Sequence, residues 1–322
     1  MDACLHDPEG GYYAARPNLG EHGDFITAPH VSQMFGELLG LWVVEVWTRL
    51  GGPNRLRLVE LGPGDGTLMS DALRAARIAP AFAAAVELVL VETSAPLRAR
   101  QAQALAGHAP RWLSRIENLD GDVPTVLLAN EFLDCLPIRQ AVRGRDGWRE
   151  RRVGLDRAGG LAFVAGERVG GPDAPLGAVL ECSPRLAEVG ASIGALVART
   201  GGAALAIDYG RAEPGLGDTL QAVRGHAKER PLANPGEADL TAHVDFPTFL
   251  AAAKNAGAQV EIVTQGAFLR RLGIEDRAAA LARANPDEGE RVDRQLDRLI
   301  GPDQMGTLFK VGTSTAPGLD PP

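Results

Sequence analysis

The fold is decided by one stretch of sequence, Leu58-Val59-Glu60-Leu61-Gly62-Pro63-Gly64-Asp65-Gly66-Thr67. A short apolar run rich in β-forming residues ends at three glycines on alternate positions, and a segment with helical periodicity follows. This order predicts a strand, a tight turn and a helix. Glycine suits the turn because a Cβ would block both its backbone angles and the close approach of a ligand. The outward-facing amides of such a turn can hold a nucleotide-like ligand.

The glycine spacing separates the possible ligands. The pattern here is G-x-G-x-G, whereas dinucleotide-binding dehydrogenases use G-x-G-x-x-G and phosphate loops need Lys and Ser or Thr after the last glycine. Glu60, just before the first glycine, would repel a pyrophosphate but suits a sulfonium and its amino group. Glu92 ends the next predicted strand, 86–91, where a carboxylate can bind ribose hydroxyls. Together these residues resemble the S-adenosylmethionine (SAM) site of class I methyltransferases.

Composition describes an acidic globular chain and disfavours several functions. Of its 322 residues, 45% are hydrophobic and 23% charged, and the net charge of −8 argues against nucleic-acid binding. We interpret the arginines of segment 139–152 as the solvated face of a hairpin. Three scattered cysteines predict no disulfide framework, no metal site and a reducing compartment. With no membrane-length apolar run and no signal or transit peptide, we expect a cytoplasmic protein without membrane insertion.

Alternating strands and helices indicate an α/β, Rossmann-like class I methyltransferase fold. We expect a mostly parallel seven-stranded sheet with helices on both faces, ending in an edge strand at 308–311. The predicted divisions are an N-terminal lid and helix at 1–53, a methyltransferase domain at 54–315 with β-rich insertions at 138–182 and 211–247, and a disordered tail at 316–322.

A second site is expected where the buried strand 125–129 ends, because parallel sheets place their chemistry beyond the carboxyl ends of strands. That segment reads Asn130-Glu131-Phe132-Leu133-Asp134-Cys135-Leu136-Pro137. A later buried strand, 203–207, is likewise followed by polar residues. The two segments extend the expected site beyond the glycine-rich turn.

Seven blocks, in order, are similar to the MidA-like family of SAM-dependent methyltransferases. The blocks are 23–29, 35–38, 60–64, 130–137, 207–210, 239–246 and 264–266. Mitochondrial members of that family are respiratory complex I assembly factors that methylate a protein arginine. The resemblance covers 10–311 and implies SAM as cofactor and a protein substrate, such as a complex I subunit. It departs at His30, where the family usually has Glu, and an N-terminal helix common in relatives is expected to be shortened or missing.

Methyl transfer from SAM is an in-line displacement, so the enzyme must align acceptor, methyl group and sulfur. We expect Gly62, Gly64 and Gly66 to admit the cofactor, Glu60 to orient its amino end and Glu92 to hold its ribose. Trp112 is either an adenine contact or a core residue. Asp24, Thr27 and Gln33 are candidates for a lid over SAM, or simply for caps within the loop.

An arginine acceptor needs carboxylates, because guanidinium is a planar cation matched to a bidentate partner. We predict that Glu131 anchors it. Asp134 is a second carboxylate or a turn residue, and Asn130 hydrogen-bonds the acceptor or the cofactor. His243 and Asp245 are weaker candidates for a base and its orienting partner.

Three alternatives remain open from the sequence. They are methylation of a small molecule, methylation of RNA, and an assembly factor that kept the fold but lost catalysis. Only an enzyme would lose its function on Glu131→Gln. Apolar positions within 266–299 are compatible with a homodimer or with a partner surface.

Overall fold

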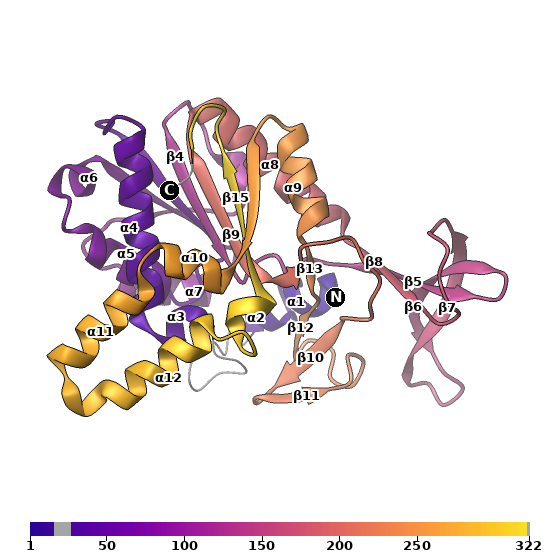
Figure 1. Cartoon of the computed structure of the whole chain (residues 1–322). Coiled ribbons are helices and arrows are strands. Elements are labelled where there is room, and N and C mark those ends of the chain that lie inside the picture. Colours follow the sequence, from indigo (N-terminus) through magenta and orange to yellow (C-terminus); the bar gives the residue numbers. More distant parts are fainter. Residues whose placement is uncertain (16–26, 321–322) are drawn as a thin grey trace.

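The structure, a computed structural model, describes residues 1–15 and 27–320. Its centre is one large sheet (Figure 1). The strands of this sheet are β1 (Leu56–Leu61), β2 (Val86–Val91), β3 (Arg111–Leu113), β4 (Thr125–Asn130), β9 (Ala203–Arg211), β14 (Gln259–Thr264) and β15 (Phe309–Thr315). They lie in the order β14-β15-β9-β4-β1-β2-β3, and the short β13 (Val244–Asp245) also pairs with β9. Among the described strands of this sheet, the antiparallel pairs are β14 with β15 and β15 with β9, and the other pairs are parallel, so the predicted mostly parallel sheet is confirmed.

The prediction that the last strand lies at the edge of the sheet is wrong. Strand β15 pairs with β9 on one side and β14 on the other, and β14 forms the edge. Its polar end, Thr313-Ser314-Thr315, is buried, with exposures of 6%, 1% and 2%. A run of hydroxyl side chains is typical of an exposed edge strand. Here the strand lies inside the sheet, because its backbone is hydrogen-bonded to a neighbouring strand on each side.

Helices cover both faces of the sheet, as predicted. The longer helices are α4 (Gln33–Arg49), α5 (Thr67–Ala76), α6 (Pro80–Ala85), α7 (Ala95–Ala104), α8 (Pro184–Thr200), α9 (Phe246–Asn255), α10 (Gln265–Arg271), α11 (Ile274–Ala284) and α12 (Gly289–Ile300). Side chains alternate along each strand: Leu56 and Leu58 of β1 pack with α4, α5 and α10–α12, whereas Val59 and Leu61 pack with α8 and α9. None of the helices in the described ranges has the length and apolarity needed to cross a bilayer.

Both insertions form small antiparallel sheets. The first contains β5 (Arg139–Gly144), β6 (Gly147–Leu155), β7 (Leu161–Val169) and β8 (Val179–Cys182), in the order β7-β6-β5-β8, and projects from the body of the molecule (Figure 1). Its arginines pair with acidic neighbours, for example Arg152 with Glu150, as expected for a solvated hairpin. The second contains β10 (Gln221–Arg224), β11 (Ala227–Glu229) and β12 (Asp239–Thr241).

The N-terminal segment has more structure than the sequence suggests. It forms short helices α1 (Asp2–His6), α2 (Tyr12–Ala15) and α3 (Ala28–Val31), where we expected loops. Leu5 and Tyr12 are buried against the second insertion, so tertiary packing orders a segment that lacks periodicity of its own. Ser32 caps α4, because its side chain accepts a hydrogen bond from the Met34 N–H.

The tail that we expected to be disordered is instead packed as far as residue 320. Leu319 is 9% exposed and belongs to the main core, and the Ala316 N–H donates to the Gly202 carbonyl. One buried apolar side chain therefore anchors a tail whose Pro/Gly-rich composition would otherwise favour disorder.

Three short helical elements complete the fold. A 3-10 turn, η1 (Ile116–Asn118), follows β3, a second, η2 (Pro286–Glu288), precedes α12, and α13 (Met305–Leu308) precedes β15.

Candidate active site

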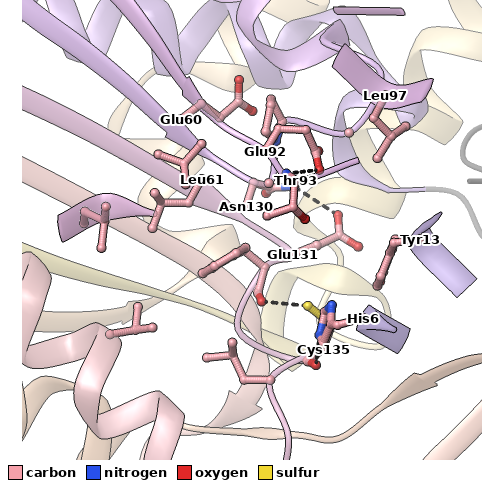
Figure 2. A pocket seen from close by; sticks show the side chains of 18 of the residues that line it. His6, Tyr13, Glu60, Leu61, Glu92, Thr93, Leu97, Asn130, Glu131 and Cys135 are labelled. Carbon is pink, nitrogen blue, oxygen red and sulfur yellow. Dashed lines mark hydrogen bonds between the residues drawn. The ribbon is translucent and has the colours of Figure 1, made fainter. Parts of the chain in front are cut away.

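A cavity of about 530 Å³ opens at the carboxyl ends of β1, β2 and β4. Its lining includes residues of the glycine-rich turn, the ends of β2 and β4, and the N-terminal segment (Figure 2). The polar and charged lining residues are Asp2, His6, Tyr13, Thr27, His30, Glu60, Asp65, Thr67, Glu92, Thr93, Ser114, Arg115, Glu117, Asn130, Glu131 and Arg185. The two sites expected from the sequence are thus two walls of one cavity.

The glycine-rich turn has the backbone that the sequence predicts. Gly62, Gly64 and Gly66 all have positive φ angles, of 60°, 55° and 90°. A Cβ on Gly62 would lie 2.8 Å from Cδ2 of Phe132, so this position has no room for a side chain. The Gly66 N–H donates to the Pro63 carbonyl, and α5 begins at the next residue. The turn therefore brings bare backbone to the cavity wall.

Glu60 offers the clearest test of whether the cavity fits SAM. Its side chain is 2% exposed, and its Oε2 atom has no hydrogen-bond partner in the described part of the chain. Burial, together with the nearby Asp65, raises the pKa of Glu60 to about 8. An unpaired buried carboxyl beside a cavity is stabilised by a cationic donor, and the amino group of SAM is one. The site therefore fits the cofactor at this end.

Glu92 lies at the end of β2, where the sequence predicts it, and lines the cavity. Its Oε1 accepts hydrogen bonds from the N–H groups of Thr93 and Ser94, each at 2.7 Å, and its Oε2 accepts one from Gln101 at 3.3 Å. Burial raises its pKa above the ordinary value. The carboxylate is held rigidly at the wall, and its bond to ribose remains a prediction.

Trp112 is not among the residues that line the cavity. It packs against the main core, and its indole N–H donates to Oε1 of Gln101 at 2.8 Å. The geometry favours a core role. Ser114, Ile116 and Glu117, which follow β3, line the cavity instead. Sequence analysis missed them, although the rule that chemistry lies beyond strand ends could have found them.

Of the three expected lid residues, only Thr27 is placed at the cavity. Asp24 lies outside the described residues, and Gln33 is exposed at the start of α4 and absent from the lining. His30, the departure from the family pattern, also lines the cavity. Its Nε2 lies 2.9 Å from Oδ2 of Asp65, and its Nδ1 lies 2.8 Å from Oγ1 of Thr27.

Asn130 and Glu131 line the cavity at the end of β4, the strand next to β1, and form what we call the acceptor wall (Figure 2). Glu131 has a φ of +49°, unusual for a side chain with a Cβ, and its N–H donates to the Ile207 carbonyl. Its Oε1 accepts hydrogen bonds from the Ala28 N–H at 2.9 Å and from Asn130 Nδ2 at 3.2 Å. Burial raises its pKa to about 7 despite the Ala28 hydrogen bond. Strained backbone at a polar cavity wall is typical of functional residues.

Asp134 is brought near this wall but not onto it. It is buried and does not line the cavity, and burial raises its pKa to about 6 despite a hydrogen bond from Tyr209. Its own N–H and that of Leu133 donate to Oδ2 of Asp208, whose side chain is 0% exposed. Asp208, which sequence analysis noted only as a polar residue at a strand end, therefore anchors the loop that carries Glu131.

His243 and Asp245 do not form the expected pair. Asp245 caps α9 by accepting hydrogen bonds from the N–H and hydroxyl of Thr248, and it pairs with Arg211 at 3.3 Å. His243 is exposed, and neither residue lines the cavity. Because helix capping engages the Asp245 carboxylate, the geometry does not favour the predicted base and its orienting partner.

The chain matches the model of a protein family described as "Putative S-adenosyl-L-methionine-dependent methyltransferase" over residues 38–264. It is 37% identical to the mitochondrial protein arginine methyltransferase NDUFAF7 of Danio rerio, covering 96% of this chain and 81% of that protein. The Homo sapiens protein of the same name is 33% identical, covering 96% and 77%. A COG1565 superfamily member from Burkholderia thailandensis, solved with bound S-adenosyl-homocysteine, aligns with a TM-score of 0.86, 29% identity and coverage of 99% and 87%.

One prediction is overturned by these relatives. We expected a cytoplasmic protein, whereas the relatives from both animals are named mitochondrial, so the cytoplasmic assignment is wrong.

The cofactor follows from the same comparison. The Burkholderia structure holds S-adenosyl-homocysteine, which is what SAM becomes after losing its methyl group. The present cavity offers bare glycine backbone, a Glu60 whose Oε2 has no hydrogen-bond partner among the described residues, and a fixed Glu92. The chain therefore belongs to the family of SAM-dependent methyltransferases, and SAM is its cofactor.

Proposed function

We propose that this enzyme transfers the methyl group of SAM to an arginine side chain of a protein. The observation that carries the proposal is Glu131, a carboxyl group that lines the cavity and is fixed by Ala28 and Asn130. The relatives named protein arginine methyltransferases, 33–37% identical to this chain, support the same acceptor.

The charge of the cavity suits a cationic acceptor. Within residues 1–15 and 27–320, six of the lining side chains are carboxylic acids: Asp2, Glu60, Asp65, Glu92, Glu117 and Glu131. The same ranges contribute two arginines and two histidines to the lining. With a pKa near 7, Glu131 is only partly ionised in the free enzyme at neutral pH, and a bound guanidinium would favour its charged form. Guanidinium binding and ionisation of Glu131 therefore support each other.

In the proposed reaction a guanidinium nitrogen attacks the methyl carbon as the carbon–sulfur bond breaks. The new bond is N–CH₃, S-adenosyl-homocysteine leaves, and the nitrogen loses a proton to Glu131 or to water. Glu131 would hold the planar guanidinium so that one nitrogen faces the methyl group. Asn130, on the same wall, would fix the carboxyl orientation through its hydrogen bond to Oε1.

The test is radiolabel transfer. The purified enzyme is incubated with methyl-labelled SAM and protein fractions, soluble and membrane, from cells that lack it, and hydrolysed protein is analysed for methylated arginine. We expect Glu131→Gln to lower labelling by about 100-fold or more. Its SAM affinity should stay within about threefold, because Gln still accepts from Ala28 and leaves the cofactor wall intact.

A matched control is Glu167→Gln, the same change on the exposed first insertion. Label in another amino acid, in RNA or in a small molecule would overturn the arginine assignment. Equal labelling by Glu131→Gln would remove Glu131 from the mechanism. The link to respiratory complex I and the homodimer stay predictions, and the labelled protein would identify the first.

A further inference from the structure

Helix α3 lies between the two walls of the cavity and contacts both. It is a single turn, Ala28–Val31, preceded by Thr27, whose carbonyl accepts from the N–H groups of His30 and Val31. The contact residues Ala28 and His30 are therefore parts of one small rigid unit. A movement of this unit would change both contacts together.

The first contact joins α3 to the cofactor turn. His30 Nε2 lies 2.9 Å from Oδ2 of Asp65, the residue between Gly64 and Gly66. The other carboxylate oxygen of Asp65 accepts from the Thr67 N–H at 3.0 Å. Burial would raise the pKa of Asp65, but hydrogen bonds from His30 and Thr67 lower it to about 2. Asp65 is therefore ionised, and His30 holds the turn through a charge-assisted bond.

The second contact joins α3 to the acceptor wall. The Ala28 N–H donates to Oε1 of Glu131 at 2.9 Å, across 103 residues of sequence. Asn130, which also donates to this oxygen, is the neighbouring residue. The segment of Glu131 meets the cofactor turn directly as well, through the pairing of β4 with β1 and the contact of Phe132 with Gly62. The Ala28 bond differs from these links because it holds the Glu131 carboxyl group itself.

The charges around His30 come from three elements. Asp65 lies in the cofactor turn, Asp71 on α5 and Glu131 after β4, and the charge of His30 lowers the pKa of each. A His30 side chain can thus satisfy two hydrogen bonds and compensate acidic neighbours. A carboxylate at position 30 would instead repel Asp65.

We propose that α3 couples cofactor binding to the orientation of Glu131, with His30 as the positioning residue. When the cofactor orders the glycine-rich turn, Asp65 positions α3 through its hydrogen bond to His30. The positioned helix then holds Glu131 through the Ala28 N–H. When the turn is loose, α3 is released and Glu131 loses one of its two donors. The role of Glu131 as acceptor carboxylate rests on the proposed function, but the coupling itself does not need an acceptor.

The experiment measures the coupling without an acceptor. Hydrogen–deuterium exchange of segment 27–31 is followed with and without S-adenosyl-homocysteine. We expect the ligand to slow exchange of the Ala28 amide about tenfold in the wild type and less than about twofold in His30→Ala. Amides of Thr93 and Ser94, on the cofactor wall, should be protected similarly in both when ligand is saturating. Equal protection of Ala28 in the two proteins would overturn the proposal.

A double-mutant cycle provides the second readout. Titration calorimetry with S-adenosyl-homocysteine compares wild type, His30→Ala, Glu131→Ala and the double variant. We expect His30→Ala to bind about fivefold more weakly, and the double variant to lose at least about fivefold less than the product of the single losses. Losses that simply multiply would show that α3 does not connect the walls.

Two further variants keep the proposal testable. His30→Gln retains a donor for Asp65 and should recover at least half of the lost protection, which a general loss of folding would not allow. If His30→Ala fails to fold, Asp65→Asn takes its place in both experiments. His243→Ala, which changes an exposed histidine outside the cavity, is the control. Neither experiment uses an acceptor, so their outcome does not depend on whether arginine is labelled. The coupling and the proposed function can therefore be refuted independently.

Discussion

The two walls of the cavity are built in different ways. On the cofactor wall the turn is closed by local contacts, since Gly66 donates to Pro63 and Thr67 donates to Asp65, and His30 and Gln101 bind it from further along the chain. On the acceptor wall the contacts are distant: Glu131 is held by Ala28, 103 residues away, and its loop by Asp208, 75 residues from Leu133. One wall is a motif that forms its own turn, whereas the other exists only once the whole sheet and the N-terminal segment have assembled.

This difference predicts that variants of the two walls will affect different measured quantities. Changes on the cofactor wall, and in α3 which contacts it, should alter SAM affinity, whereas changes to the other supports of the acceptor wall should alter turnover with little effect on SAM affinity. The variants below run from the largest expected effect to the smallest.

Glu60→Gln should have the largest effect. Removing the buried carboxylate that would receive the SAM amino group should weaken SAM binding about 100-fold, a typical loss for one partner of a buried charge pair. Calorimetric titration of the variant measures it. Glu87→Gln, which changes a partly buried carboxylate of the neighbouring strand β2 that pairs with Arg55 and does not line the cavity, is the control. Unchanged affinity would place the amino group elsewhere.

The same residue predicts a pH dependence of the free protein. Because the folded-state pKa of Glu60 is raised to about 8, the folded state binds its proton more tightly than the unfolded state does. The free energy of unfolding should therefore fall as pH rises from the ordinary Glu value toward 8. Glu60→Gln should flatten this slope in denaturant titrations at pH 5 and pH 8. A slope identical to that of the wild type would contradict the assignment.

Asp208→Asn tests the distant support of the acceptor wall. The amide nitrogen cannot accept, so at least one of the backbone N–H groups of Leu133, Asp134 and Tyr209 loses its partner. We expect a loss of about 1–3 kcal/mol in the free energy of unfolding. Turnover should fall about 30-fold, because misplacement of Glu131 costs alignment. SAM affinity should stay within about threefold.

The control for this variant is Asp303→Asn, an exposed carboxylate in the turn before α13. If Asp208→Asn weakened SAM binding as much as turnover, the two walls would be one cooperative unit and the division proposed above would not hold.

The same contrast explains how much could be predicted from sequence. The strand, glycine turn and helix at 58–76 follow from neighbouring residues, and so does the position of Glu92 at a strand end. The support of Glu131 by Ala28 and Asp208 depends on residues that only the fold brings together. Asp245 shows that local sequence can also suggest a role that the fold does not support, since this candidate catalytic carboxylate caps helix α9. Leu319 shows how one apolar side chain can order a tail of unfavourable composition.

Gly62→Ala should have a moderate effect on the cofactor wall. The added methyl group meets Phe132 at 2.8 Å in a backbone region with positive φ, so the turn must shift. We expect SAM binding to weaken about tenfold. Gly159→Ala is the matched control, because that glycine also has positive φ but no atom within 4 Å of the added Cβ. Equal SAM affinity in the two variants would show that the turn tolerates a side chain.

Trp112 should have the smallest effect on the cofactor. Its indole N–H bonds Gln101, whose own amide donates to the Gly64 carbonyl, so Trp112 reaches the cofactor turn only through another side chain. Trp112→Phe and Trp112→Leu should both keep SAM affinity within about threefold of wild type, while the lost hydrogen bond lowers the free energy of unfolding by about 1 kcal/mol or more. Parallel calorimetric and denaturant titrations compare the two variants. An adenine contact predicts the reverse pattern, with affinity retained by Phe and lost by Leu, because only an aromatic ring can stack on the base.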